Sequence, residues 1–218
     1  MKNVLPSVQD FTRMPAPASA PIGIAYDGSR LWIGSVETDR LYATDSHTGS
    51  VSEEWEAPGT PYGLVAFDGE LRVVVGDAQS DDRSIARFIA GKGFKSETLP
   101  CPDATGSWLA HDGDALFLSQ RFEHRILELD RAGAVQRSIS VQREITGMTI
   151  VDGAFYLMTT ESKEVDDYRL VRLDARAGEP RETELAALTV TGRGLAYDGE
   201  RFWTNLRGEN TVVSFTLP

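Results

Sequence analysis

The first strong pattern along the chain is a pair of apolar runs on either side of an Asp-Gly dipeptide, in residues 23–35. Ile24 and Tyr26 precede the dipeptide, and Leu31 and Ile33 follow it. Such bulky, β-branched or aromatic side chains suit a pleated surface. Because glycine takes a positive φ without steric cost, an Asp-Gly pair between alternating apolar runs is a strong hairpin signal. Residues 23–35 are therefore predicted to form a strand, a tight turn and a second strand.

The same unit returns four more times. The five Asp-Gly pairs begin at Asp27, Asp68, Asp112, Asp152 and Asp198, at steps of 41, 44, 40 and 46 residues. A period near 40–45 residues with several short strands per repeat is typical of the blades of a β-propeller. The pattern predicts that these five aspartates serve the turns rather than catalysis.

Each repeat contains strands in one order, called a to d here. Strand a precedes the Asp-Gly turn, and strand b follows it at residues 31–35, 72–76, 116–120, 155–159 and 202–205. Strand c is expected at residues 40–45, 84–88, 125–130, 169–174 and 211–215. A second turn leads to a polar outer strand d, as at residues 51–55 and 135–139. Residues 184–189 fit a short helical turn, a d strand or a loop equally well.

The fifth repeat stops after its c strand, and the segment Pro6–Arg13 precedes the first a strand. We expect Pro6–Arg13 to pair with Thr211–Phe215 as a displaced d strand, because closing the ring removes unpaired strand edges. The predicted fold is all-β. It is a five-bladed β-propeller of four-stranded antiparallel blades, a single domain over residues 1–218, with the last blade closed by the N-terminal strand.

Composition and charge limit the classes of function and partner that the chain could have. Hydrophobic residues make up 41% of the 218 residues and charged residues 25%, which is enough for a core. The formal net charge of −11 argues against nucleic acid or an anionic membrane as partner, since both require basic patches. No signal-peptide pattern and no apolar run of membrane-spanning length is present, so a cytoplasmic protein is expected. The one cysteine, Cys101, is interpreted as an ordinary loop thiol.

The repeated pattern Gly-[Ile/Leu]-Ala-Tyr-Asp-Gly-x-x-[Leu/Phe]-Trp, with a c strand ending in Leu-Asp, resembles the gluconolactonase-like, NHL and YVTN-type β-propellers. Five such blades also resemble the plant and bacterial glutaminyl cyclases. That resemblance implies an acidic or amide residue beside the glycine of strand a. In this chain the place is held by Ile22, Tyr62, Ser107, Thr146 and Arg193, none of which is acidic. The resemblance therefore implies the architecture and not the cyclase activity.

The starts of a strands and the ends of b strands should meet at the mouth of the central channel, opposite the Asp-Gly turns, where a concave ligand site is expected. Arg121, Arg193 and Arg207 could hold an anionic group there. Tyr62 and Trp108 could stack on a ring of the ligand. The remaining candidates for ligand contacts are Gln120, Thr146 and Asn205.

Proton transfer or metal binding would fall to Glu37, Asp77 and Glu161, with Asn205 as a further oxygen ligand. No spacing motif supports a divalent metal, so solvated loop acids are the alternative. His124 is the histidine placed to act as a general base, and an ordinary surface histidine is the competing interpretation.

Two functions remain open. The leading hypothesis is a small-molecule site at the channel mouth, acting on a small anionic or aromatic substrate as a hydrolase, lyase or cyclase, or as a simple binder. The alternative is a protein-interaction platform without catalysis. Convergent polar groups in a pocket favour the first, and a plugged channel with an exposed apolar patch favours the second. The sequence indicates neither the substrate nor the oligomeric state.

Overall fold

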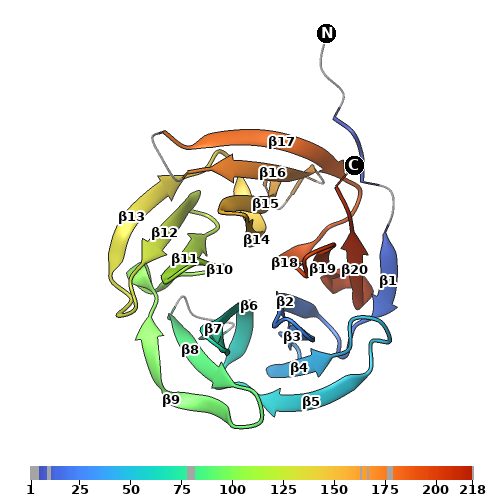
Figure 1. The fold of residues 1–218 in the computed structure, drawn as a ribbon, viewed down its shortest axis with the longest axis vertical. Helices are drawn as coiled ribbons and strands as arrows, with labels where there is room; N and C mark the ends of the chain where they lie inside the picture. Colours follow the sequence, from blue (N-terminus) through green and yellow to red (C-terminus); the bar gives the residue numbers. More distant parts are fainter. Residues whose placement is uncertain are drawn as a thin grey trace.

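The computed structural model of the chain describes residues 5–8, 11–77, 82–162, 164–165, 167–175 and 179–217. Within these residues, five four-stranded antiparallel sheets stand in a ring around a central axis (Figure 1). The architecture is a five-bladed β-propeller, as the repeat predicted. In each blade, strand a lies nearest the axis and strand d lies outermost.

The strands of the first three blades follow one another directly along the chain. Blade 1 contains β2 (Pro21–Tyr26), β3 (Leu31–Ser35), β4 (Arg40–Thr44) and β5 (Val51–Glu56). Blade 2 contains β6 (Thr60–Phe67), β7 (Glu70–Gly76), β8 (Arg83–Ile89) and β9 (Gly93–Pro100). A short 3₁₀ turn, η1 (Pro102–Ala104), leads to blade 3, which contains β10 (Leu109–Asp112), β11 (Ala115–Gln120), β12 (Arg125–Leu129) and β13 (Val135–Ser140).

Blade 4 contains β14 (Glu144–Val151), β15 (Ala154–Thr160), β16 (Tyr168–Asp174) and β17 (Arg181–Leu188). Blade 5 combines β18 (Arg193–Tyr197), β19 (Phe202–Leu206) and β20 (Thr211–Phe215) with β1 (Thr12–Pro15), and a second 3₁₀ turn, η2 (Arg207–Glu209), follows β19. Of the three possibilities for residues 184–189, the strand is observed, because β17 pairs with β16 along its length.

The ring is closed by the N-terminal strand, as predicted, but by a later segment than Pro6–Arg13. β1 pairs with β20 in the register Thr12 to Ser214 and Pro15 to Thr211. Ser7 instead forms a parallel bridge with Ala187 on the outer strand of blade 4. The segment around Ser7 thus contacts blade 4 before the chain reaches blade 5, so the strand that closes the ring begins later in the sequence than expected.

The Asp-Gly turns are structural, as expected. In blade 1, Oδ1 of Asp27 accepts hydrogen bonds from the backbone N–H groups of Ser29 and Arg30, and Oδ2 accepts one from the indole N–H of Trp32 at 2.7 Å. Asp198 repeats this arrangement with Trp203 in blade 5, at 2.6 Å. In blades 2 and 4 the aspartate itself has a positive φ, a conformation that Asp tolerates better than most residues.

The inner strands approach one another closely, and glycine permits this. A Cβ atom on Gly63 would collide with the backbone carbonyl oxygen of Ser107 in the next blade, and one on Gly147 would lie 2.7 Å from the carbonyl carbon of Gly194. Much of the apolar core lies between neighbouring blades. Trp32 packs edge-on against Phe88 between blades 1 and 2, with ring centroids 5.1 Å apart. In the described part of the chain, no helix is long and apolar enough to cross a membrane.

Candidate functional site

The two faces of the ring differ. We call the face that carries the Asp-Gly turns the Asp-Gly face, and the opposite one, where b–c and d–a connections lie, the loop face. A narrow central cavity of about 120 Å³ is lined by the ends of all five inner strands that adjoin the Asp-Gly turns. Toward the loop face, Ile22, Trp108 and Ile145 belong to one apolar cluster, with Val36 and Tyr62 packed against it. Apolar side chains therefore occupy the expected channel mouth.

The aromatic candidates at this mouth are engaged in packing. Trp108 is 5% exposed and donates its indole N–H to the carbonyl oxygen of Ile145 at 2.9 Å. The guanidinium carbon of Arg83 lies 4.0 Å from the ring centroid of Tyr62. Thr146 is fully buried and donates to the carbonyl oxygen of Met158 at 3.3 Å. In this structure, neither Trp108 nor Thr146 presents a free surface to a ligand.

Three further candidates stabilise the blades. Arg121 forms an ion pair with Glu144 of the neighbouring blade, with Nη2 and Oε2 2.7 Å apart and both side chains largely buried. Gln120 is buried and donates to the carbonyl oxygens of Pro102 and Thr105. Asn205 is also buried and donates to the carbonyl oxygen of Gly23 at 3.0 Å. These contacts account for Arg121 and Gln120 without a ligand. The Oδ1 atom of Asn205 has no hydrogen-bond partner within the described residues.

The predicted catalytic residues lie in separate b–c connections. Glu37, Asp77 and Glu161 are exposed and follow the b strands of blades 1, 2 and 4. His124 has a φ of 50°, and its carbonyl oxygen accepts a hydrogen bond from Val141 at 2.8 Å. The structure does not bring the four together. Among the described residues, no group of three or more His, Cys, Asp or Glu side chains is placed to hold a metal ion.

His124 has a conformational reason for its place in the turn. Asp39 and Asn210 occupy the same position in the turns of blades 1 and 5, with φ values of 51° and 50°. Their carbonyl oxygens accept hydrogen bonds from Ala57 and Ala16, as that of His124 does from Val141. Asp, Asn and His are enriched in this left-handed region. The turn therefore explains the residue type at position 124 without catalysis.

Arg193 and Arg207 do come together. Both line a cavity of about 630 Å³ on the loop face between blades 5 and 1. Arg193 begins the inner strand β18, and Arg207 begins η2 directly after β19. Within the described residues, neither forms an ion pair with a carboxylate, whereas Arg121 does. The other lining residues are Ala20, Thr191, Leu206, Gly208 and Glu209.

Arg193 is held in place by the blade before it. Its Nη1 atom donates to the hydroxyl oxygen of Tyr168 and to the carbonyl oxygen of Gly192, each at 2.9 Å. Its guanidinium carbon also lies 5.6 Å from the ring centroid of Tyr168, which is 4% exposed. These contacts use one of its terminal nitrogens. Further N–H donors on the same planar fork remain for a ligand.

Sequence reasoning missed the remaining lining residues. Ala20 has a φ of 47°, and its N–H donates to the side-chain oxygen of Asn210 at 2.8 Å. Thr191 lies two residues before β18, and Glu209 forms an ion pair with Arg13 at 2.6 Å. The positive φ of Ala20 could not have been predicted, because no sequence pattern indicates that conformation at an alanine. Glu209 could have been found from its spacing of two residues after Arg207 in the same b–c turn.

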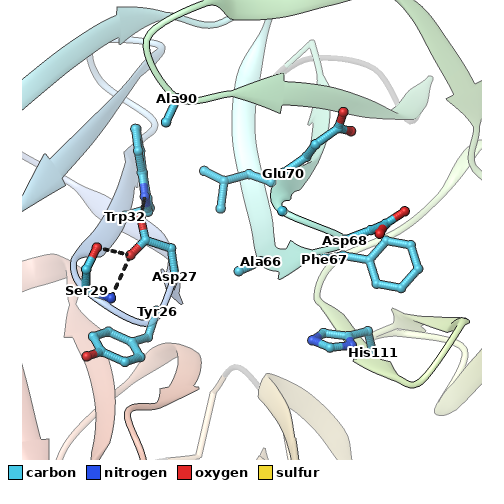
Figure 2. Close-up of a pocket in the computed structure, with 12 residues that line it drawn as sticks. Tyr26, Asp27, Ser29, Trp32, Ala66, Phe67, Asp68, Glu70, Ala90 and His111 are labelled. Carbon is cyan, nitrogen blue, oxygen red and sulfur yellow. Dashed lines mark hydrogen bonds between the residues drawn. The ribbon is translucent and has the colours of Figure 1, made fainter.

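A second cavity, of about 440 Å³, opens on the Asp-Gly face between blades 1 and 2. Figure 2 shows Asp27 and Trp32 on one side of it and Phe67, Asp68 and Glu70 on the other. The position of this cavity is explained by the size of the innermost residue next to each Asp-Gly turn. This residue is small in blade 2 and larger in the other blades: Ala66 against Tyr26, His111, Ile150 and Tyr197.

The polar groups of this second cavity already serve the blades. Asp27 accepts the indole N–H of Trp32. Glu70 accepts hydrogen bonds from Arg87 and Arg72. His111 packs against Phe67 of the preceding blade, with ring centroids 5.3 Å apart and ring planes tilted by 60°, so it packs between blades as expected from its place in the repeat. The loop-face cavity is the better candidate for a ligand site, because its two arginines pair with no carboxylate in the described part of the chain.

Solved structures share this architecture. A glutaminyl cyclase from Myxococcus xanthus superposes with a TM-score of 0.75 and 13% identity, over 99% of this chain and 98% of that chain. A catalytically inactive virginiamycin B lyase from Staphylococcus aureus, solved with quinupristin, gives a TM-score of 0.54 and 13% identity, over 96% and 99% of the two chains. The PQQ-bound aldose sugar dehydrogenase from Streptomyces coelicolor gives 0.52 and 14%, over 99% and 100%.

At these identities the similarity establishes the β-propeller fold and no shared activity. No family model and no curated protein sequence matches the chain. The structural neighbours include enzymes of several kinds, so the fold is compatible with catalysis. Which ligand this chain takes must be argued from its own cavity.

Proposed function

We propose that the protein binds a small organic anion, a carboxylate or a phosphate monoester, in the loop-face cavity of Arg193 and Arg207. The supporting observation is that two arginines with no carboxylate partner among the described residues line one cavity in a chain of net charge −11. Most other arginines of the described chain form ion pairs with carboxylates, as Arg121 does with Glu144. Two guanidinium groups that line one cavity repel each other, and an anion bound between them relieves that repulsion.

The two arginines would contribute to ligand binding in different ways. Arg193 is pre-organised by Tyr168 and can present two parallel N–H groups to a carboxylate or phosphate. Arg207 is exposed on a short turn and can close on the ligand from the rim. A cavity of about 630 Å³ is within the size range of small-molecule sites.

Hydrolase, lyase or cyclase chemistry on the bound anion is the second candidate, favoured by the cyclase and lyase among the structural neighbours. Proton transfer would need an acid–base group beside the ligand. Glu209 is the carboxylate of this cavity, whereas Glu37, Asp77 and Glu161 stand on other blades. Turnover of a ligand that binds, followed by mass spectrometry, tests this candidate directly.

A protein-interaction platform is less favoured. The large exposed apolar side chains are spread over different blades and loops: Val51, Phe122, Val135, Val165 and Leu217. An interaction surface usually gathers such residues in one patch. The plugged channel alone does not favour a platform, because the candidate cavity lies beside the channel and not in it.

The test is thermal unfolding against a panel of small carboxylates and phosphate monoesters. A ligand at about 100 times its Kd stabilises the folded state by about 2.7 kcal/mol and raises the Tm visibly. We expect Arg193→Ala and Arg207→Ala to abolish the shift and Arg193→Lys to reduce it, since lysine lacks the bidentate fork. Arg131→Ala is the matched control, because it removes one positive charge from an exposed side chain near the Asp-Gly turn of blade 2. A shift that survives both alanine variants would contradict the proposed site.

A further inference from the structure

The charges of the loop-face cavity are not all of one sign. Glu209 lines the same cavity as Arg193 and Arg207. Arg207 and Glu209 stand two residues apart in the turn η2, yet they form no ion pair with each other in the described structure. Cationic and anionic groups therefore border one cavity without neutralising each other.

We infer that the ligand is zwitterionic: a molecule with the chemistry of an α-amino acid, whose carboxylate binds Arg193 and Arg207 and whose ammonium group binds Glu209. This inference rests on the proposed anion site and adds the second charge. A simple acid would satisfy the arginines and leave Glu209 unused. A ligand with both charges matches every ionised side chain that lines the cavity.

Glu209 remains accessible to an ammonium group. Its partner, Arg13, lies on the closing strand β1, with Nη1 and Oε2 2.6 Å apart. The side chain of Arg13 is 48% exposed and that of Glu209 is 58% exposed, and exposed ion pairs of this kind contribute little to stability. A carboxylate has several lone-pair directions, so Glu209 can accept a ligand ammonium beside Arg13 or in its place.

Arg13 itself is not among the residues that line the cavity. Its contact with Glu209 lies on the blade 5 side of the cavity, where the N-terminal strand closes the ring. A substitution of Arg13 therefore removes the ion pair and keeps the carboxylate of Glu209. Position 209 offers one that removes the carboxylate and keeps the shape.

The experiment compares matched ligands that differ in the amino group alone. Isothermal titration calorimetry of the full chain would use L-glutamate against glutarate, L-leucine against 4-methylpentanoate and L-phenylalanine against 3-phenylpropionate. We expect at least one amino acid to bind about tenfold tighter than its partner acid, a typical effect of one charged contact. Glu209→Gln should remove that advantage without weakening binding of the partner acid, because the variant takes a negative charge out of the cavity. Arg13→Gln should preserve or increase it.

The outcomes separate the two proposals. If acids bind equally well with and without the amino group, and Arg193→Ala abolishes both, the anion site stands and the zwitterion inference fails. If an amino acid binds tighter than its partner acid but Glu209→Gln does not change the ratio, the inference also fails, because another group then holds the ammonium. If no member of the three pairs binds at about 10 mM, well above a weak Kd of about 1 mM, the zwitterion inference fails. The anion site fails as well if no phosphate monoester of the thermal-unfolding panel binds.

Discussion

The guanidinium of Arg193 donates a hydrogen bond of 2.9 Å to the hydroxyl oxygen of Tyr168 on the neighbouring blade. Arg193 begins the inner strand of blade 5, and Tyr168 begins the third strand of blade 4. The phenol is almost fully buried, so its oxygen stands at a fixed place between the two blades. An arginine anchored in this way loses little conformational entropy when it binds a ligand.

Tyr168→Phe should therefore weaken anion binding without unfolding the protein. The variant removes one hydrogen bond, worth about 1 kcal/mol net, which corresponds to roughly a fivefold loss of affinity. Calorimetry with the anion that binds wild type measures the loss. Tyr156→Phe, in the same blade, is the matched control and should bind as wild type does. Equal affinities in wild type and Tyr168→Phe would show that the phenol does not position Arg193.

Asp27→Ala should destabilise the fold by about 2–3 kcal/mol. Burial raises the pKa of Asp27, but the hydrogen bonds from Trp32, Ser29 and Arg30 outweigh it and hold that pKa below its ordinary value. The alanine variant leaves the indole N–H of the buried Trp32 without its acceptor. Urea unfolding followed by tryptophan fluorescence gives the change. Asp45→Ala, which removes a turn aspartate that holds no tryptophan, should cost clearly less.

Gly63→Ala should be among the most damaging small substitutions, at about 3 kcal/mol or complete loss of folding. The added methyl group would meet the backbone carbonyl of Ser107, which cannot move aside as a flexible side chain would. Gly208→Ala is the comparison, since a Cβ there meets nothing within 4 Å. We expect Gly208→Ala to change the free energy of unfolding by less than about 1 kcal/mol. Similar midpoints for the two variants in urea would contradict close packing of the inner strands.

Acid should weaken the protein through Glu70. Hydrogen bonds from Arg87 and Arg72 outweigh burial and lower the pKa of Glu70 from 4.5 to about 2. Because the unfolded chain binds this proton at a higher pH than the folded one, the stabilisation is complete above about pH 5 and is lost as the pH falls toward 2. The loss should be on the order of 2 kcal/mol after solvent screening. Glu70→Gln should flatten the dependence of unfolding free energy on pH in this range, and an unchanged slope would exclude Glu70 as its source.

Cys101 should be inert in the folded protein. Burial raises the pKa of its thiol to about 12, although the nearby Arg83 opposes the shift, so the reactive thiolate is scarce at neutral pH. We expect a thiol-specific chromogenic reagent to react slowly with the native chain and completely in urea. Rapid stoichiometric labelling of the native protein would contradict a buried structural thiol.

The turns and strands were predictable because their causes are local. The bounds expected for residues 31–35 and 211–215 are those of β3 and β20. An Asp-Gly pair sets its own hairpin through neighbouring residues, and the repeat of that hairpin counts the blades. The closing strand was misplaced, at Pro6–Arg13 instead of Thr12–Pro15, because its partner lies about 200 residues away and no local signal sets that register.

The candidate site was also predictable only where its causes are local. Arg121, Arg193 and Arg207 follow from the blade pattern as one class of residue at the loop face. Glu144 of the next blade reaches Arg121 and neutralises it, while Arg193 and Arg207 line a shared cavity. Hairpin geometry depends on adjacent residues, so the chain order specifies the blades. Which charges meet depends on how one blade packs against the next, and only the closed ring decides that.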